Sequence, residues 1–210
     1  MDPQTHSPFP APDPQDLPDT PPCAGRREAL KRGACACLGA AFAGSAAPAF
    51  ADDAADQRPT KGDRLVVAGA DGSPRPLTVA DIKPGSKPVL AFPYDPAGKV
   101  VRDGSRFNKV LLVRLDPAGL DATTKARAAD GVMAFSAVCT HQGCDVTEWV
   151  DADKAVMCFC HFSRFDPARG GQVVAGPAPR PLPALPLMVD RGQLAVAGPF
   201  TSSPGVKAVG

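Results

Sequence analysis

The feature that most constrains this chain is a pair of short cysteine–histidine boxes separated by a sixteen-residue spacer between His141 and Cys158. The first box is Cys139-Thr140-His141-Gln142-Gly143-Cys144, and the second is Cys158-Phe159-Cys160-His161-Phe162-Ser163. Each box offers thiolate and imidazole groups at close spacing, so one loop can supply two ligands and two facing loops can supply four. Soft thiolates and borderline imidazoles suit either zinc or an iron–sulfur cluster. The sequence therefore predicts a metal centre held between two loops.

Composition excludes several other classes of protein. The 210 residues include 25 prolines and 20 glycines with only 6% aromatic residues, which is typical of a loop-rich β protein. The formal net charge is +1, so no basic surface for nucleic acid or for a membrane is indicated and no nucleic-acid partner is expected. The sequence contains no glycine-rich phosphate loop and no serine–histidine–aspartate set.

The first 51 residues predict an export signal rather than a packed fold. Residues 1–24 contain eight prolines, and Arg26-Arg27 opens a basic segment. Residues 33–51 carry no charge and end in Ala49-Phe50-Ala51, which fits the small-residue rule for signal cleavage. This order predicts a twin-arginine signal and a periplasmic destination. Retention as a membrane anchor stays open, because nineteen uncharged residues approach the about 20 that span a bilayer.

The two boxes resemble the C-T-H-x-G-C and C-x-C-H-x-S-x-[YF]-D patterns of the Rieske [2Fe–2S] family, in its disulfide-bearing, high-potential branch. The resemblance covers about residues 131–199. It includes Gly176-Pro177-Ala178-Pro179-Arg180-Pro181, which is similar to the proline loop that covers the cluster in this family. Residues 160–166 and 171–173 also resemble the small, Rieske subunit of arsenite oxidase.

The resemblance implies one [2Fe–2S] cluster per chain and assigns roles to the cysteines and histidines. The ligands it implies are Cys139 and Cys158 on one iron and His141 and His161 on the other; the disulfide it implies is Cys144–Cys160. Phe159 and Phe162 stand where relatives frequently carry proline and glycine, so the second loop is unusually aromatic.

Further residues are expected to tune or cover the cluster. Ser163 matches a serine whose hydroxyl donates to a bridging sulfide, which stabilises the reduced cluster and raises its potential. Phe165 replaces a tyrosine that is common in quinol-oxidising members and whose hydroxyl donates to a cysteine sulfur. Gly176, Pro177 and Pro179 are expected in the loop that covers the cluster.

The remainder of residues 52–210 is expected to be scaffold. Recurrent short β-branched runs between turn signals predict an all-β fold, an antiparallel β-sandwich with a smaller Rieske-like cluster-binding subdomain at about 131–185. Residues 121–130 leave a short helix capped by Asp121 and a solvated loop equally open. Trp149 is expected to be a packing residue, with an electron relay as the alternative. The charged stretch 99–109 is expected to be solvated, with partner docking as the alternative.

These expectations lead to an electron-transfer subunit rather than a catalyst on its own. The resemblance implies a periplasmic one-electron carrier that takes electrons from a large molybdenum-containing, arsenite oxidase-like subunit and passes them to a soluble cytochrome or cupredoxin. The alternative is the Rieske subunit of a quinol-oxidising cytochrome bc complex, for which the N-terminal segment would stay as a membrane anchor. A structural zinc module is a third class.

Overall fold

The computed structural model describes residues 53–70 and 72–206, and the predicted export signal at 1–51 lies outside them. Twelve strands are formed in this part of the chain. The strands are β1 (Arg64–Val67), β2 (Val89–Asp95), β3 (Val100–Val101), β4 (Val110–Arg114), β5 (Val132–Ser136), β6 (Val146–Val150), β7 (Ala155–Cys158), β8 (Arg164–Asp166), β9 (Gln172–Ala175), β10 (Ala184–Leu185), β11 (Leu187–Asp190) and β12 (Gln193–Val196).

Eight strands form one curved antiparallel sheet that almost closes on itself. The strand order is β10-β5-β4-β2-β1-β12-β11, with β3 paired to β2. The two strands at the ends of this order, β10 and β11, are separated in sequence by Pro186 alone. The two edge strands are therefore held next to each other by a one-residue connection, which is why the sheet almost closes.

Strands β4 and β5 are apolar on both faces because each lies between two cores. Val110 and Leu112 alternate with Leu111 and Val113, so successive side chains point to opposite sides of the sheet. The first pair belongs to the core enclosed by the curled sheet, and the second to a core on its outer face. Such strands appear in the sequence as continuous apolar runs.

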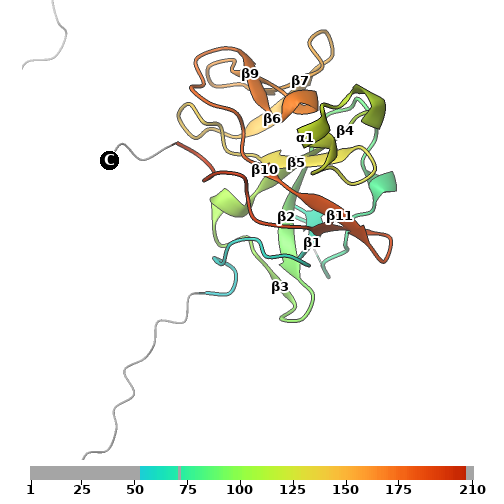
Figure 1. The fold of residues 1–210 in the computed structure, drawn as a ribbon. Coiled ribbons are helices and arrows are strands. Elements are labelled where there is room, and N and C mark those ends of the chain that lie inside the picture. Colours follow the sequence, from blue (N-terminus) through green and yellow to red (C-terminus); the bar gives the residue numbers. More distant parts are fainter. Residues whose placement is uncertain (1–52, 71, 207–210) are drawn as a thin grey trace, which may run out of the picture. The chain divides into compact units, whose positions relative to one another are not determined.

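The outer core is closed by a second antiparallel sheet in the order β6-β7-β8-β9. Figure 1 shows β6, β7 and β9 gathered at one end, away from β1, β2 and β3. Cys139, Cys158 and Phe165 lie in this outer core, each at most 1% exposed. The small sheet and the outer face of β4 and β5 thus form the two layers between which the boxes are placed.

The predicted all-β sandwich with a smaller subdomain is confirmed for the described residues. One short α-helix, α1 (Ala122–Lys125), occurs in this part of the chain, and the Asp121 side chain caps it by accepting from the Thr124 amide at 2.6 Å. Trp149 packs against the outer core as expected. In residues 53–70 and 72–206 no helix has the length and apolar character to cross a bilayer.

Candidate metal centre

The first box is a tight loop between β5 and β6 that is closed by its own backbone. The Cys139 amide donates to the Cys144 carbonyl at 2.8 Å, and the Gly143 amide donates back to the Cys139 carbonyl at 3.0 Å. Gly143 has a φ of 79°, the left-handed region that glycine adopts without strain. This turn keeps the Cys139 side chain in the core while His141 is half-buried.

The second box turns between β7 and β8 in a similar way. The Cys158 amide donates to the Ser163 carbonyl at 2.9 Å, so the two ends of the box are held together. Phe162 has a φ of 57° and occupies the left-handed region, which costs a residue with a Cβ about 1–2 kcal/mol. Cys158 is buried, whereas Phe159, His161 and Phe162 are exposed.

The structure brings the donor groups of the two boxes together. A disulfide joins Cys144 to Cys160 with a Cα–Cα distance of 6.5 Å, and both sulfurs lie within 4.8 Å of the Cys158 sulfur. The rings of His141 and His161 stand edge to face with centroids 4.5 Å apart. Two free thiols therefore lie inside the site, and two imidazoles lie toward its outer end.

This donor set fits a cluster with a thiolate pair and an imidazole pair. His141 Nδ1 is buried and has no hydrogen-bond partner among the described residues, which is expected of a nitrogen reserved for a metal. Burial and, secondarily, the neighbouring Cys158 raise the pKa of the Cys139 thiol above its ordinary value. A metal that binds the thiolate must therefore displace a proton, so ligation and proton release are coupled here.

The loop at 176–180, which the sequence predicts to cover the cluster, is held to both boxes. The Ala178 amide donates to Ser163 Oγ at 3.1 Å, and the Thr140 hydroxyl donates to the Arg180 carbonyl at 2.7 Å. Gly176 lies so close to the second box that a Cβ there would be 2.5 Å from the Ser163 Cα. Glycine is therefore required at this position by close approach as well as by its φ of 83°. We call residues 176–180 the cover loop.

The other predicted residues divide between the interior and the surface. Ser163 is completely buried beside Ala178, and Phe165 is completely buried in the outer core, where it pairs with Val156 and Val173 across the small sheet. Pro177 and Pro179 are exposed on the outside of the cover loop. Phe165 thus fills core volume next to the boxes rather than facing solvent.

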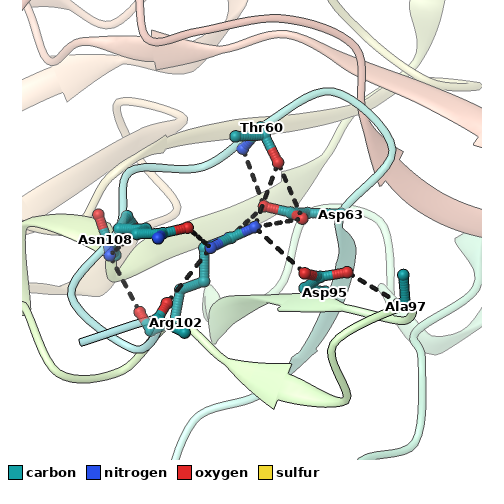
Figure 2. A network of polar contacts seen from close by, with 8 residues as sticks. Thr60, Asp63, Asp95, Ala97, Arg102 and Asn108 are labelled. Atoms are coloured by element: carbon teal, nitrogen blue, oxygen red, sulfur yellow. Dashed lines mark hydrogen bonds and ion pairs between the residues drawn. The ribbon is translucent and has the colours of Figure 1, made fainter. Parts of the chain in front are cut away.

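The charged stretch 99–109 is solvated in part, as the sequence predicts, but two of its residues, Arg102 and Asn108, are buried. Arg102 is 4% exposed and donates two hydrogen bonds to Asp63, at 2.7 and 3.2 Å, with Asp95 3.7 Å away (Figure 2). It also donates to the Gln57 side chain at 3.1 Å. The stretch therefore anchors the segment that precedes β1, and Asn108 adds a bond of 2.8 Å from its side chain to the Gln57 carbonyl.

Two more cations of this stretch support the first box. Arg106 donates to the Gly143 carbonyl and to Asp145, and Lys109 Nζ lies 2.9 Å from Asp145 Oδ2. Sequence reasoning missed these contacts because nothing local to 99–109 points to a loop some forty residues away. The signal available was the unusual density of cations, which also suits an ordinary solvated surface.

Comparisons with known proteins agree with this arrangement. The profile of the Rieske [2Fe-2S] domain matches residues 108–186. A putative respiratory nitrate reductase Rieske subunit of Haloferax mediterranei is 41% identical over 106 residues, 50% of this chain and 47% of that protein. The cytochrome bc1 complex Rieske iron-sulfur subunit of Streptomyces lividans is 33% identical over 137 residues, 62% of this chain and 78% of that protein.

A solved structure is similar at lower identity. The soluble domain of Rieske protein II from Sulfolobus acidocaldarius is 24% identical, with 49% of this chain and 67% of that chain covered and a TM-score of 0.39. The chain spans about half the length of the nitrate reductase relative. The domain match over both boxes and the cover loop, and the bc1 relative matched over most of its length, show that this chain belongs to the Rieske protein family, an electron-carrier family whose domain binds a [2Fe–2S] cluster.

Proposed function

We propose that this chain is the one-electron carrier subunit of a periplasmic oxidoreductase. In this proposal it receives electrons from a large molybdenum-containing catalytic subunit, of the arsenite oxidase kind, and delivers them to a soluble cytochrome or cupredoxin. The observation that carries the proposal is the polarity of the site. Buried thiols lie at its inner end, and the half-buried His141 and the exposed His161 lie at its outer end, so electrons can enter and leave through one face.

The ligand roles are part of the proposal. Cys139 and Cys158 would hold one iron, and His141 and His161 the other, with the Cys144–Cys160 disulfide fixing the separation of the two loops. The [2Fe–2S] cluster supplies reversible one-electron chemistry when bound. The protein contributes two buried cysteines, a buried His141 Nδ1 that has no hydrogen-bond partner among the described residues, and the exposed ring of His161.

The face around His161 is suited to a partner with an uncharged surface. Phe159 and Phe162 are 62% and 56% exposed, and their ring centroids are 5.9 Å apart. Neither box contains a lysine, arginine, aspartate or glutamate. The backbone of Phe162 is in the left-handed region, which is strained for a residue with a side chain. Such backbone strain is concentrated at functional sites. Contact at this face would therefore depend on apolar fit more than on charge.

A periplasmic location is supported by the N-terminal sequence pattern and by the disulfide. The twin-arginine pattern at Arg26-Arg27 and the small residues ending at Ala51 lie outside the described residues. The Cys144–Cys160 disulfide is of the kind that persists in an oxidising compartment. Twin-arginine export also suits this chain because that route carries folded proteins with their cofactor in place.

The second candidate is the Rieske subunit of a quinol-oxidising cytochrome bc complex. It is favoured by the relatives that are named as cytochrome bc1 Rieske subunits, one of them matched over 78% of its length. Phe165 supports the first candidate, because it offers no hydroxyl to a cysteine sulfur and so favours a lower potential than quinol oxidation uses.

The proposal is tested by measuring which reductants and oxidants react with the purified, cluster-loaded full chain. Decylubiquinol and a soluble c-type cytochrome serve as probes in stopped-flow mixing. Fast oxidation of the reduced protein by the cytochrome, with no reaction with decylubiquinol, supports the first candidate. Rapid reduction by decylubiquinol supports the second.

The ligand assignment has its own test, with a neighbouring residue as control. His161→Ala should abolish the native visible and EPR spectrum, whereas Phe162→Ala, at the next and also exposed position of the same loop, should preserve it. An unchanged spectrum in His161→Ala would refute the ligand role of this residue.

A further inference from the structure

The end of the chain returns to the metal centre after the last strand is complete. Residues 201–206, here called the C-terminal strap, begin beside β10, where Thr201 and Ala184 exchange two hydrogen bonds. The Thr201 amide donates to the Ala184 carbonyl at 2.9 Å, and the Ala184 amide donates to Thr201 Oγ1 at 3.0 Å. The strap is thus fixed at its start to the large sheet.

Arg180 joins this strap to the cover loop. Its guanidinium donates to Ser202 Oγ at 3.3 Å, to the Ser203 carbonyl at 2.8 Å and to the Gly205 carbonyl. No ion pair of Arg180 with a carboxylate is found within residues 53–70 and 72–206. Its charged guanidinium therefore donates to uncharged acceptors of the strap. Bonds from a charged donor are about twice as strong as neutral ones.

The same residue also reaches the first box through its backbone. The Arg180 carbonyl accepts from the Thr140 hydroxyl at 2.7 Å, and Thr140 is completely buried between the ligand candidates Cys139 and His141. One residue therefore connects three segments that are far apart in sequence. These segments are the first box, the cover loop and the strap.

The far end of the strap rests against the support of the first box. Gly205 packs so closely on the Phe107 ring that a Cβ would lie 2.7 Å from it, and the φ of Gly205 is 79°. Phe107 follows Arg106, which donates to the Gly143 carbonyl. The contacts therefore form a closed ring from the first box through Arg106 and Phe107 to the strap, then through Arg180 to the cover loop and back to Thr140.

We propose that Arg180 is a positioning residue that uses the C-terminal strap as a latch to hold the cover loop shut over the metal centre. The cover loop has exposed prolines, and apart from the Arg180 side chain it is held by the Ala178–Ser163 bond, the Thr140–Arg180 bond, the close approach of Gly176 and the packing of Ala178 in the outer core. Without the latch it opens more often, and water reaches the buried Ser163 and the thiols. The proposal needs the family's cluster site but not the identity of the redox partners.

The test is hydrogen exchange measured by mass spectrometry on the cluster-loaded full chain. Arg180→Gln should speed exchange about tenfold in peptides from both 174–182 and 199–206, the factor for a loss of about 1.4 kcal/mol. Exchange in β4 should stay unchanged, which separates local opening from general destabilisation. Arg180→Lys keeps the charge and some donors and should restore part of the protection. Arg75→Gln, which removes another arginine from the surface, is the matched control.

A second variant acts from the other end of the ring. Gly205→Val leaves Arg180 intact but places a side chain against Phe107, and it should open the cover loop to the same degree. Both variants should also lose their cluster absorbance to EDTA faster than the wild-type protein. If Arg180→Gln frees the strap while the 174–182 peptide keeps its protection, or if Gly205→Val leaves that peptide unchanged, the latch is refuted.

Discussion

Replacing Ser163 by alanine should lower the midpoint potential of the cluster. The Ser163 oxygen accepts the Ala178 amide at 3.1 Å, so that bond leaves the hydroxyl proton for another acceptor. The side chain is completely buried at the end of the second box. We expect the hydroxyl to donate to the cluster, and a donor stabilises the reduced form because this form carries the additional negative charge.

The size of the shift follows from the strength of one hydrogen bond. A net bond of about 1–1.5 kcal/mol corresponds to a drop of about 40–65 mV, since 1.4 kcal/mol is tenfold and tenfold is about 59 mV for one electron. The potential is read by protein-film voltammetry on wild-type and variant proteins at the same pH.

Ser136 supplies a matched control inside the same molecule. It is also completely buried, and its oxygen accepts the Val138 amide at 3.1 Å. Ser136→Ala should therefore cost a similar free energy of unfolding, about 1 kcal/mol, yet leave the potential unchanged. Equal potentials in the wild-type and Ser163→Ala proteins, with the visible spectrum intact, would show that the hydroxyl does not donate to the cluster.

Three further outcomes are expected from other parts of the structure. Arg102→Met should lower the free energy of unfolding by about 3–5 kcal/mol because it leaves the Asp63 carboxylate buried without its charged partner. Denaturant unfolding measures this free energy, and the double variant Arg102→Met/Asp63→Leu should be more stable than Arg102→Met alone. Phe162→Gly should raise the free energy of unfolding by about 1 kcal/mol, because glycine adopts the left-handed backbone without strain. A lower melting temperature in this variant would show that the Phe162 backbone is not strained. The Arg75 guanidinium and hydrogen bonds from Thr78 lower the pKa of Asp81 from 3.8 to about 2. The stability that this carboxylate adds is therefore present above about pH 4 and is lost as the pH falls toward 2. In calorimetry, Asp81→Asn should be less stable than the wild-type protein at pH 6 and should approach it near pH 2.

The signal for the metal centre in the sequence is local. Thiols and imidazoles two or three positions apart are readable without any knowledge of the fold, and they fall in two loops that the structure brings together. The buried strands are equally readable, since β4 and β5 are continuous apolar runs. By contrast, β6 carries Thr147, Glu148 and Trp149 with half-exposed side chains, and no apolar run marks it.

The supports of the site could not be predicted because their partners are distant in sequence. Arg102 and Arg106 lie in a stretch whose charges suit solvent, and only the folded chain places Asp63 and Gly143 beside them. The strap contains two serines, a proline and a glycine, a composition typical of a loose chain end. Arg180 donates to it from more than twenty residues away, and no local pattern in the sequence indicates that contact.

The most direct test of the account is an EPR-monitored redox titration of the purified protein. A rhombic signal in the reduced state, with an average g value below that of the free electron and a positive midpoint potential within about −150 to +300 mV, is the predicted result. It would establish a cluster with two thiolate and two imidazole ligands in a chain built to carry single electrons. A colourless, EPR-silent protein that contains zinc would contradict the account, because zinc has no redox chemistry to offer.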